Sequence, residues 1–353
     1  MNRDTPLFNW VHAKATIDLG QRSNWHAWRI FVAQAMLYLA CLFGASMDAS
    51  PFLNIIFSLF SGFCIGQLFV IGHDACHQSL AKSRWVNHLI GRLCFLPSLH
   101  AYSLWRLEHN IKHHQHTNIK GLDPSWSPIS KDEFQLLPKH RQWLERIYRS
   151  TWGGGLYYLL EMWCRNHVLP INSDTISQWR RYLPDSLSII AFILIQPLLL
   201  LGLKDLIAPS KSVWELYILT WAIPFLVWNW MMGFVIYLHH THPEIKWFDA
   251  APDLDSLQQQ LHVTAHVIFP QPINGFLYAI MAHNAHHIKP NIPLYSLRQA
   301  QTNLEASLAA KNLTYHWTPA RHQAIVRTCK LYDYDRQCWT DFDGVPTTTP
   351  CYN

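Results

Sequence analysis

The histidines of this chain are grouped at spacings that suit metal binding. There are 22 of them in 353 residues, nearly as many as the 23 acidic residues. Most fall in four short clusters, at residues 73–77, 109–116, 239–242 and 283–287. Residues i and i+4 of a helix share a face, so each of three clusters can direct two or more imidazoles toward one ligand. Four such clusters indicate a shared metal centre rather than isolated packing histidines.

The residue types in these clusters narrow the choice of metal. Imidazole suits iron, zinc, copper and nickel, whereas magnesium and calcium prefer oxygen ligands. Eight or nine histidines exceed what one ion coordinates, which implies two ions. The clusters contain no carboxylate pair or Glu-x-x-His motif of soluble di-iron bundles, and Cys76 is their only cysteine. A haem would leave adjacent pairs such as His113 and His114 unexplained. We interpret the clusters as a histidine-only, two-iron, oxygen-activating site.

Four uncharged stretches are long enough to carry these clusters to a membrane surface, since a bilayer is crossed by about 20 helical residues. They lie at residues 30–47, 51–73, 186–203 and 216–238. The connections 48–50 and 204–215 are short, so we predict two transmembrane hairpins with all larger segments on one side. That side carries 26 of the 28 Lys and Arg residues, and the positive-inside rule makes it cytoplasmic. The prediction is a multi-pass protein of a bacterial inner membrane.

The composition agrees with a membrane protein. Half of the residues are hydrophobic and 14% are charged, against about 25% charged in soluble domains. This argues against a disordered chain or an ordinary soluble enzyme. We assign the net charge of +5 to the membrane topology and to attraction by anionic lipid rather than to nucleic-acid binding.

The eight scattered cysteines indicate reduced thiols. Residues 1–26 do not look like a cleavable signal peptide. We expect 87–105 to lie at the membrane interface and the final forty residues to be irregular.

Four segments carry a resemblance to a known family. They read GHDACHQSLAKSRWVNHLIGRLCFLP, WRLEHNIKHHQHTN, LHHTHPEIKW and MAHNAHHIKPNIPLYSLRQAQ, and they resemble the integral-membrane fatty acid desaturases over about residues 50–305. The resemblance implies an all-α membrane protein in which four transmembrane helices carry a cytosolic helical cap with a di-iron site. We expect one domain over residues 1–353, with its cap formed by 74–185 and 239–353.

The same resemblance implies nine metal ligands. They are His73, His77, His109, His113, His114, His240, His283, His286 and His287. At the fourth span His240 is preferred to its neighbours His239 and His242. We expect His116 to be an exposed or supporting residue, and His262 and His266 to be structural despite their i, i+4 spacing. Asp74, Glu108 and Asp123 are candidates to orient ligand imidazoles, because metal-bound histidines usually donate their other N–H to such groups.

The activity that follows from the resemblance is O₂-dependent desaturation of an acyl chain taken from the bilayer. Two Fe²⁺ ions would activate O₂ for C–H abstraction. The His-Pro-Gly-Gly haem motif of a fused cytochrome b5 is absent from the sequence, so we expect a separate electron-donor protein.

Relatives that share these clusters support other outcomes: hydroxylation, ketolation, or decarboxylation to a terminal alkene. The position of the acyl chain relative to iron decides among them. The sequence does not select the chain length, the double-bond position, the acyl carrier, the redox partner or the oligomeric state. A histidine-rich metal transporter is a remote alternative. It is disfavoured because spans 30–47 and 186–203 contain no histidine, whereas transporters place ligands at mid-membrane.

Overall fold

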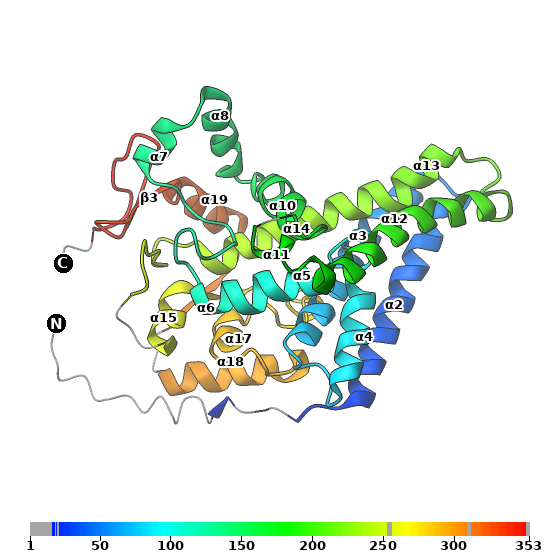
Figure 1. Ribbon diagram of the computed structural model, residues 1–353, viewed down its shortest axis with the longest axis horizontal. Helices are drawn as coiled ribbons and strands as arrows, with labels where there is room; N and C mark the ends of the chain where they lie inside the picture. The colour runs from blue at the N-terminus through cyan, green and yellow to red at the C-terminus, as the bar shows by residue number, and fades with distance from the viewer. Residues whose placement is uncertain are drawn as a thin grey trace. The chain divides into compact units, whose positions relative to one another are not determined.

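The computed structural model describes residues 16–17, 19, 21–171, 173–252, 256–308 and 312–350. The chain, whose helices and strands are labelled in Figure 1, divides into two compact units. We call Ser23–Ile111 together with Trp152–Val235 the span unit. We call Met1–Arg22, Lys112–Thr151 and Ile236–Asn353 the mixed unit, because its described part contains both helices and strands. Each unit is described by itself.

Four helices are long and apolar enough to cross a membrane, which confirms the four predicted spans. They are α2 (Asn24–Ser46), α3 (Pro51–Cys76), α12 (Trp179–Ile207), and the continuous run of α13 (Val213–Tyr217), η3 (Ile218–Ala222) and α14 (Ile223–His240). All four are longer than predicted, because the helical backbone continues past the polar residues that bounded the predicted spans. Ser23 accepts a hydrogen bond from the His26 N–H at the start of α2, and Ser50 does so from Leu53 at the start of α3.

Polar contacts join the first two helices and the short connections at their ends. The amide of Asn54 on α3 donates to the carbonyl oxygens of Gly44 and Met47 at distances of 3.1 and 3.0 Å. Asn54 Oδ1 in turn accepts from Lys211 Nζ at 3.0 Å. In the same region the Asp48 carboxylate accepts from the backbone N–H of Ser210 at 3.2 Å. The turn after α2 and the loop after α12 therefore meet at one end of the span unit.

A buried hydrogen bond between two glutamines links α2 to α3 within their apolar stretches. Gln34 Nε2 donates to Gln67 Oε1 at 2.9 Å. Such polar pairs in membrane helices contribute about 0.6 kcal/mol on average and up to about 1.7 kcal/mol. We expect Gln34→Leu to lower the free energy of unfolding by about 1 kcal/mol, and Gln34→Leu/Gln67→Leu to recover most of that loss, because no glutamine then lacks its partner. Thermal unfolding in detergent measures both; a double variant less stable than either single one would contradict this.

The other span-unit helices are shorter. They are α4 (Arg84–Phe95), α5 (Tyr102–Arg106), most of η1 (Leu107–His113), α9 (Gly154–Tyr157), η2 (Tyr158–Trp163), α10 (Cys164–Asn166) and α11 (Ser173–Ile176). One carboxylate organises the helices before the second histidine cluster. Asp185 of α12 accepts from Arg92 Nε at 2.6 Å and from the Ser103 backbone N–H at 3.0 Å. Asp185 thus fixes α4 and the first turn of α5, which leads directly into η1.

The mixed unit combines helices with two small sheets. Its helices are α6 (His114–His116), α7 (Lys131–Leu136), α8 (Lys139–Tyr148), α15 (Ser256–Val263), α16 (Ile273–Phe276), α17 (His283–Ile288), α18 (Leu294–Leu308) and α19 (Pro319–Thr328). Strand β1 (Ala265–Ile268) pairs in parallel with β2 (Leu313–His316), and β3 (Leu331–Asp333) pairs antiparallel with β4 (Cys338–Thr340). Trp126, Trp247 and Trp339 form part of the buried core. Arg149 is also buried there and pairs with Glu145.

Two expectations about secondary structure were wrong in detail. The chain is mostly helical but not all-α, and the last forty residues include α19, β3 and β4. Strands of three or four residues are too short to show a reliable alternation in sequence. Helix α19 begins at a recognisable cap, since Thr318 accepts from the Arg321 N–H and Pro319 occupies the first turn. The seven cysteines of the described part are free, and Cys351 lies outside the described residues.

Candidate metal centre

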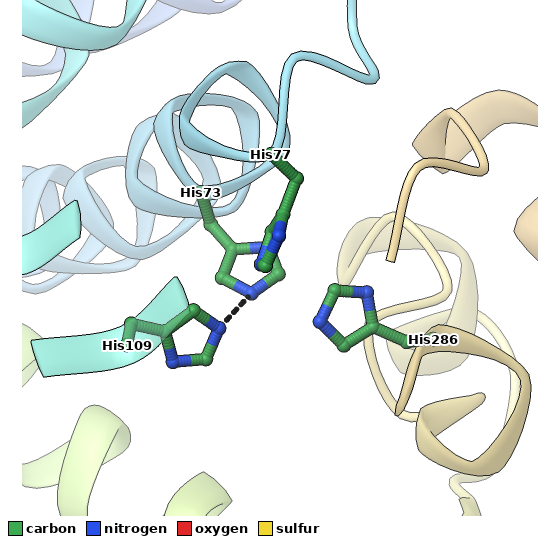
Figure 2. Close-up of side chains that lie close together, drawn as sticks. All are labelled: His73, His77, His109 and His286. Carbon is green, nitrogen blue, oxygen red and sulfur yellow. Dashed lines mark hydrogen bonds between the residues drawn. The ribbon is translucent and has the colours of Figure 1, made fainter. Parts of the chain in front are cut away.

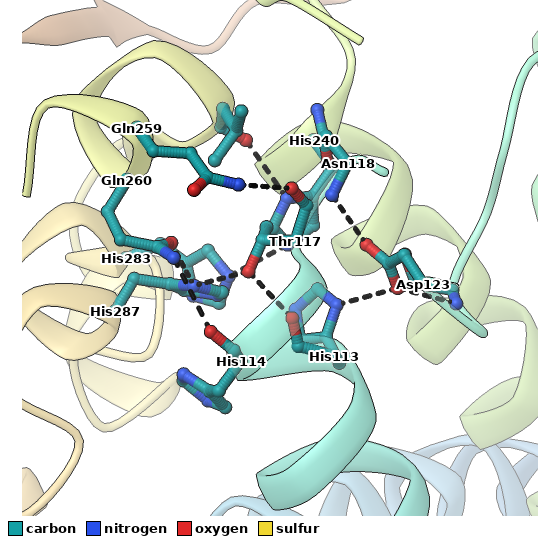
Figure 3. Close-up of polar contacts among 12 residues, drawn as sticks. His113, His114, Thr117, Asn118, Asp123, His240, Gln259, Gln260, His283 and His287 are labelled. Carbon is teal, nitrogen blue, oxygen red and sulfur yellow. Dashed lines mark hydrogen bonds and ion pairs between the residues drawn. The ribbon is translucent and has the colours of Figure 1, made fainter. Parts of the chain in front are cut away.

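Four buried histidines converge within the mixed unit (Figure 3). His113 comes from the end of η1, His240 from the end of α14, and His283 and His287 from α17. One ring nitrogen of each lies within 4.8 Å of the corresponding nitrogen of the others. His283 and His287 are one helical turn apart, so α17 presents both on the same face. We call these residues the four-histidine cluster.

Hydrogen bonds fix which nitrogen of each imidazole faces the cluster. His113 Nδ1 lies 2.9 Å from Asp123 Oδ1, His240 Nδ1 lies 3.0 Å from the Val263 carbonyl, and His287 Nδ1 lies 2.8 Å from Gln260 Oε1. Each of these oxygens is an acceptor, so each Nδ1 carries the proton and Nε2 is left as a lone-pair donor. His240 Nε2 and His283 Nε2 approach to 3.0 Å. This is the second-sphere pattern usual for metal-bound imidazoles.

Burial keeps two members of the cluster in the neutral form that binds metal. Desolvation, reinforced by neighbouring histidines, holds the pKa of His283 and of His287 well below the usual value. Both imidazoles are therefore neutral at physiological pH, as metal coordination requires. The Nε2 of His287 and the Nδ1 of His283 are buried without a hydrogen-bond partner in the described part of the chain. The unpartnered Nε2 of His287 fits a bound transition metal, whereas the nitrogen of His283 that faces the cluster is its Nε2, beside His240.

A second group of histidines lies within the span unit (Figure 2). His73 and His77 are one turn apart at the end of α3, and His109 lies on η1. His73 Nε2 and His109 Nε2 are 2.8 Å apart. Two contacts hold η1 in this position: Asn110 Nδ2 donates to the Cys76 carbonyl at 2.8 Å, and the Trp105 ring stacks on His109 at a centroid distance of 5.0 Å. We call His73, His77 and His109 the three-histidine group.

The two remaining predicted ligands, His114 and His286, lie together in the mixed unit. Their Nε2 atoms are 3.2 Å apart, and the ring of His114 stacks on that of His287 at a centroid distance of 4.3 Å. Every one of the nine predicted histidines is therefore beside at least one other. Their assignment as ligands stays a prediction.

The groups do not follow the sequence clusters. His109 and His113 have i, i+4 spacing, which predicts a shared face, yet they belong to different groups. Both histidines lie on η1, a π-helical segment with i→i+5 hydrogen bonds. The spacing of two histidines within a cluster therefore does not decide which group they join.

The histidines expected to be structural occupy other positions. His266 Nδ1 lies 2.6 Å from Glu305 Oε1, His262 is exposed, and His242 stacks on Tyr315. His116 is half-buried and belongs to neither group among the described residues. His239 stacks on the ring of His283 at 3.6 Å, so it supports a cluster member from the side.

Among the three carboxylates proposed to orient ligands, Asp123 contacts His113, and its orienting role stays a prediction. Asp74 lies 3.8 Å from His73 Nδ1, and Glu108 is buried. The sequence interpretation missed Gln260 and Trp105. A glutamine and a tryptophan carry no metal-binding signature, and only the fold brings them to an imidazole.

Comparison with known proteins agrees with this geometry. Residues 49–319 match the family Fatty acid desaturase. The chain is 31% identical over 280 residues to an sn-1 oleoyl-lipid 12-desaturase of Synechocystis, covering 78% of this chain and 75% of that protein. It is 29% identical to an sn-1 oleoyl-lipid 12-desaturase of Anabaena variabilis, covering 82% and 80%. A chloroplastic omega-6 fatty acid desaturase of Spinacia oleracea is 30% identical, covering 78% of this chain and 58% of that protein. The chain therefore belongs to the membrane fatty acid desaturase family and is an oxidoreductase.

Proposed function

We propose that this enzyme uses two iron ions and O₂ to introduce a double bond into a lipid-linked acyl chain. The observation that carries the proposal is the four-histidine cluster, whose buried imidazoles converge within 4.8 Å in a chain of the desaturase family. One ion would be held by this cluster and the other by the three-histidine group, with His114 and His286 completing the set of nine. An all-imidazole donor set suits iron and leaves coordination positions for O₂.

The relatives suggest the acyl substrate. Several are named as 12-desaturases of sn-1 oleoyl lipids, and others as omega-6 desaturases. We therefore propose a membrane lipid carrying a monounsaturated chain as the substrate, with the new double bond formed at carbon 12 of an oleoyl chain.

Bound iron would supply the oxidising power that removes hydrogen from an unactivated methylene with O₂ as the oxidant. The protein's residues supply the rest. Asp123, Gln260 and the Val263 carbonyl hold three imidazoles in one tautomer and orientation, so that Nε2 faces the metal. Burial of the cluster excludes water, which would otherwise compete for the oxidant. The reducing electrons would come from a separate donor protein.

Expression in a bacterial host supplied with oleate tests the activity. We expect mass spectrometry of total fatty acids to show a doubly unsaturated chain with its new double bond at carbon 12. The control is the His283→Ala variant in the same host, which should give the host lipid profile. A new double bond elsewhere would overturn the proposed position. Only a hydroxy acid, or only a terminal alkene among the headspace volatiles, would replace desaturation with another reaction of the family.

Metal analysis separates the enzyme from a metal-binding membrane protein. We expect roughly two irons per purified chain, because nine imidazoles exceed the coordination number of one ion. A single exchangeable zinc would contradict the proposed di-iron site.

We further propose that the two short connections lie on the outer side of the membrane and that the large segments are cytoplasmic. The contacts of Asp48 with Ser210 and of Asn54 with Lys211 support this, because they bring both connections to one end of the span unit. In a protein that carries both Met47→Cys and Cys164→Ser, a membrane-impermeant maleimide should label position 47 in intact cells. In the protein with its native Cys164, the same reagent should label this exposed cysteine only after permeabilisation. The reverse pattern would overturn the orientation.

A further inference from the structure

The helix that carries three predicted ligands is poorly equipped to hold its own position. Helix α17 has six residues, and isolated helices of that length are unstable in water. Its first N–H groups lack intrahelical partners, as at every helix start. Ala282 occupies the N-cap position and offers no side-chain acceptor. The orientation of His283, His286 and His287 therefore depends on contacts from elsewhere in the mixed unit.

A residue of the neighbouring helix provides the missing cap. Gln301 of α18 is 1% exposed, and its Oε1 accepts a hydrogen bond from the Ala285 N–H at 2.9 Å. Ala285 is the third residue of α17, the position whose N–H a capping side chain usually satisfies. It lies between His283 and His286 in the sequence. The cap of the ligand helix thus comes from a residue sixteen positions further along the chain.

A carboxylate orients this glutamine. Gln301 Nε2 donates to Glu305 Oε1 at 2.9 Å, one turn along α18. The same oxygen lies 2.6 Å from His266 Nδ1 on β1 and accepts from Thr314 Oγ1 on β2 at 2.9 Å. With Nε2 bound to the carboxylate, Oε1 must face α17. Burial alone would raise the pKa of Glu305. These donors outweigh burial and lower the pKa of Glu305 to about 2, so Glu305 is ionised.

The neighbouring residue of α17 is held from β1. Asn284 is fully buried, and its Nδ2 donates to the carbonyl and the Oγ1 of Thr264 at 3.0 and 2.9 Å. Thr264 directly precedes β1, the strand that carries His266. Helix α17 is consequently restrained at Asn284 by the β1 side and at Ala285 by α18.

We propose that Gln301 is a positioning residue for the metal ligands of α17, and that Glu305 and His266 position Gln301 in turn. The inference rests on the proposed metal-binding role of α17. It gives His266 a function that its i, i+4 spacing with His262 does not suggest. Gln301 touches no metal ligand side chain in the contacts described. It acts on α17 through the Ala285 N–H and through Asn284 Oδ1, which accepts from Gln301 Nε2 at 3.5 Å.

Cobalt binding to the full-length chain, stripped of metal with a chelator, tests the proposal without relying on catalysis. Co²⁺ bound to imidazoles absorbs visible light, and its spectrum reports ligand geometry. We expect Gln301→Leu to weaken Co²⁺ binding by roughly ten- to a hundredfold and to change the spectrum. Glu305→Leu should resemble it, whereas Glu305→Gln retains an acceptor for Gln301 Nε2 and should bind Co²⁺ close to the wild type. Gln299→Leu is the matched control, because Gln299 is exposed on the same helix and bonds only Asn303 among the contacts described.

The outcomes distinguish this inference from the proposed function. Wild-type affinity and spectrum in Gln301→Leu would overturn the positioning role, as would a loss equalled by Gln299→Leu. Thermal unfolding of the metal-free variants shows whether a variant is misfolded or whether only its metal ligands are misplaced. If Gln301→Leu does not fold, the comparison of Glu305→Leu with Glu305→Gln tests the positioning role instead. A wild type that binds Co²⁺ normally but forms no unsaturated product would overturn the proposed function and leave the positioning role standing. A wild type that binds no Co²⁺ would overturn both.

Discussion

Replacement of His283 by alanine is expected to abolish product formation and to lower bound iron from roughly two ions per chain toward one. His283 Nε2 lies 3.0 Å from His240 Nε2, and the His283 ring also contacts His286 and His287. Its removal takes one of four imidazoles from the four-histidine cluster and leaves a cavity beside the other three. Iron content by elemental analysis and fatty acid composition by mass spectrometry give the two measurements.

The matched control for this variant is His116→Ala. His116 lies in the second sequence cluster but in neither histidine group of the described residues. We expect it to retain wild-type iron and activity. If His116→Ala lost iron while His283→Ala kept it, the assignment of the four-histidine cluster would be wrong.

Replacement of Asp123 by asparagine is expected to weaken metal binding by roughly ten- to a hundredfold, the usual cost of losing a carboxylate behind a metal-bound histidine. Burial pushes the pKa of Asp123 upward, but His113 and the Asn118 N–H more than offset this, so its pKa lies below the usual value. The ionised carboxylate keeps the proton of His113 on Nδ1.

Asparagine fits this site poorly in either orientation. Oδ1 of Asp123 lies 2.9 Å from His113 Nδ1 and accepts from the Ser125 N–H at the same distance, while Oδ2 accepts from the Asn118 N–H at 2.8 Å. An amide NH₂ in place of either oxygen would face a donor. Cobalt titration measures the affinity, and Asp132→Asn, an exposed carboxylate of α7, is the control. Wild-type affinity in Asp123→Asn would show that this carboxylate does not orient a metal ligand.

Local features were predictable from the sequence. The four membrane helices are apolar runs longer than a bilayer crossing requires, and such a run can be recognised from its own residues alone. The same holds for i, i+4 pairs on ordinary α-helix. His73 with His77, and His283 with His287, share a group as their spacing predicts.

Features that depend on several segments of the chain were not predictable from the sequence. The short strands β1 and β2 pair across 44 intervening residues between Ile268 and Leu313, and too few residues lie in each to show a pattern. His109 and His113 belong to different groups, and their spacing within one sequence cluster does not reveal this.

The sequence by itself determined the membrane spans, the kind of metal-donor atom and the family, because apolar length, residue type and motif spacing are properties of consecutive residues. Tertiary structure alone decided which histidines of different segments share a group and which neighbours orient them. His113, His240 and His287 are brought together from three separate segments, and their orienting partners are an aspartate, a carbonyl and a glutamine. These partners act through hydrogen-bond geometry, which exists only once the chain has folded.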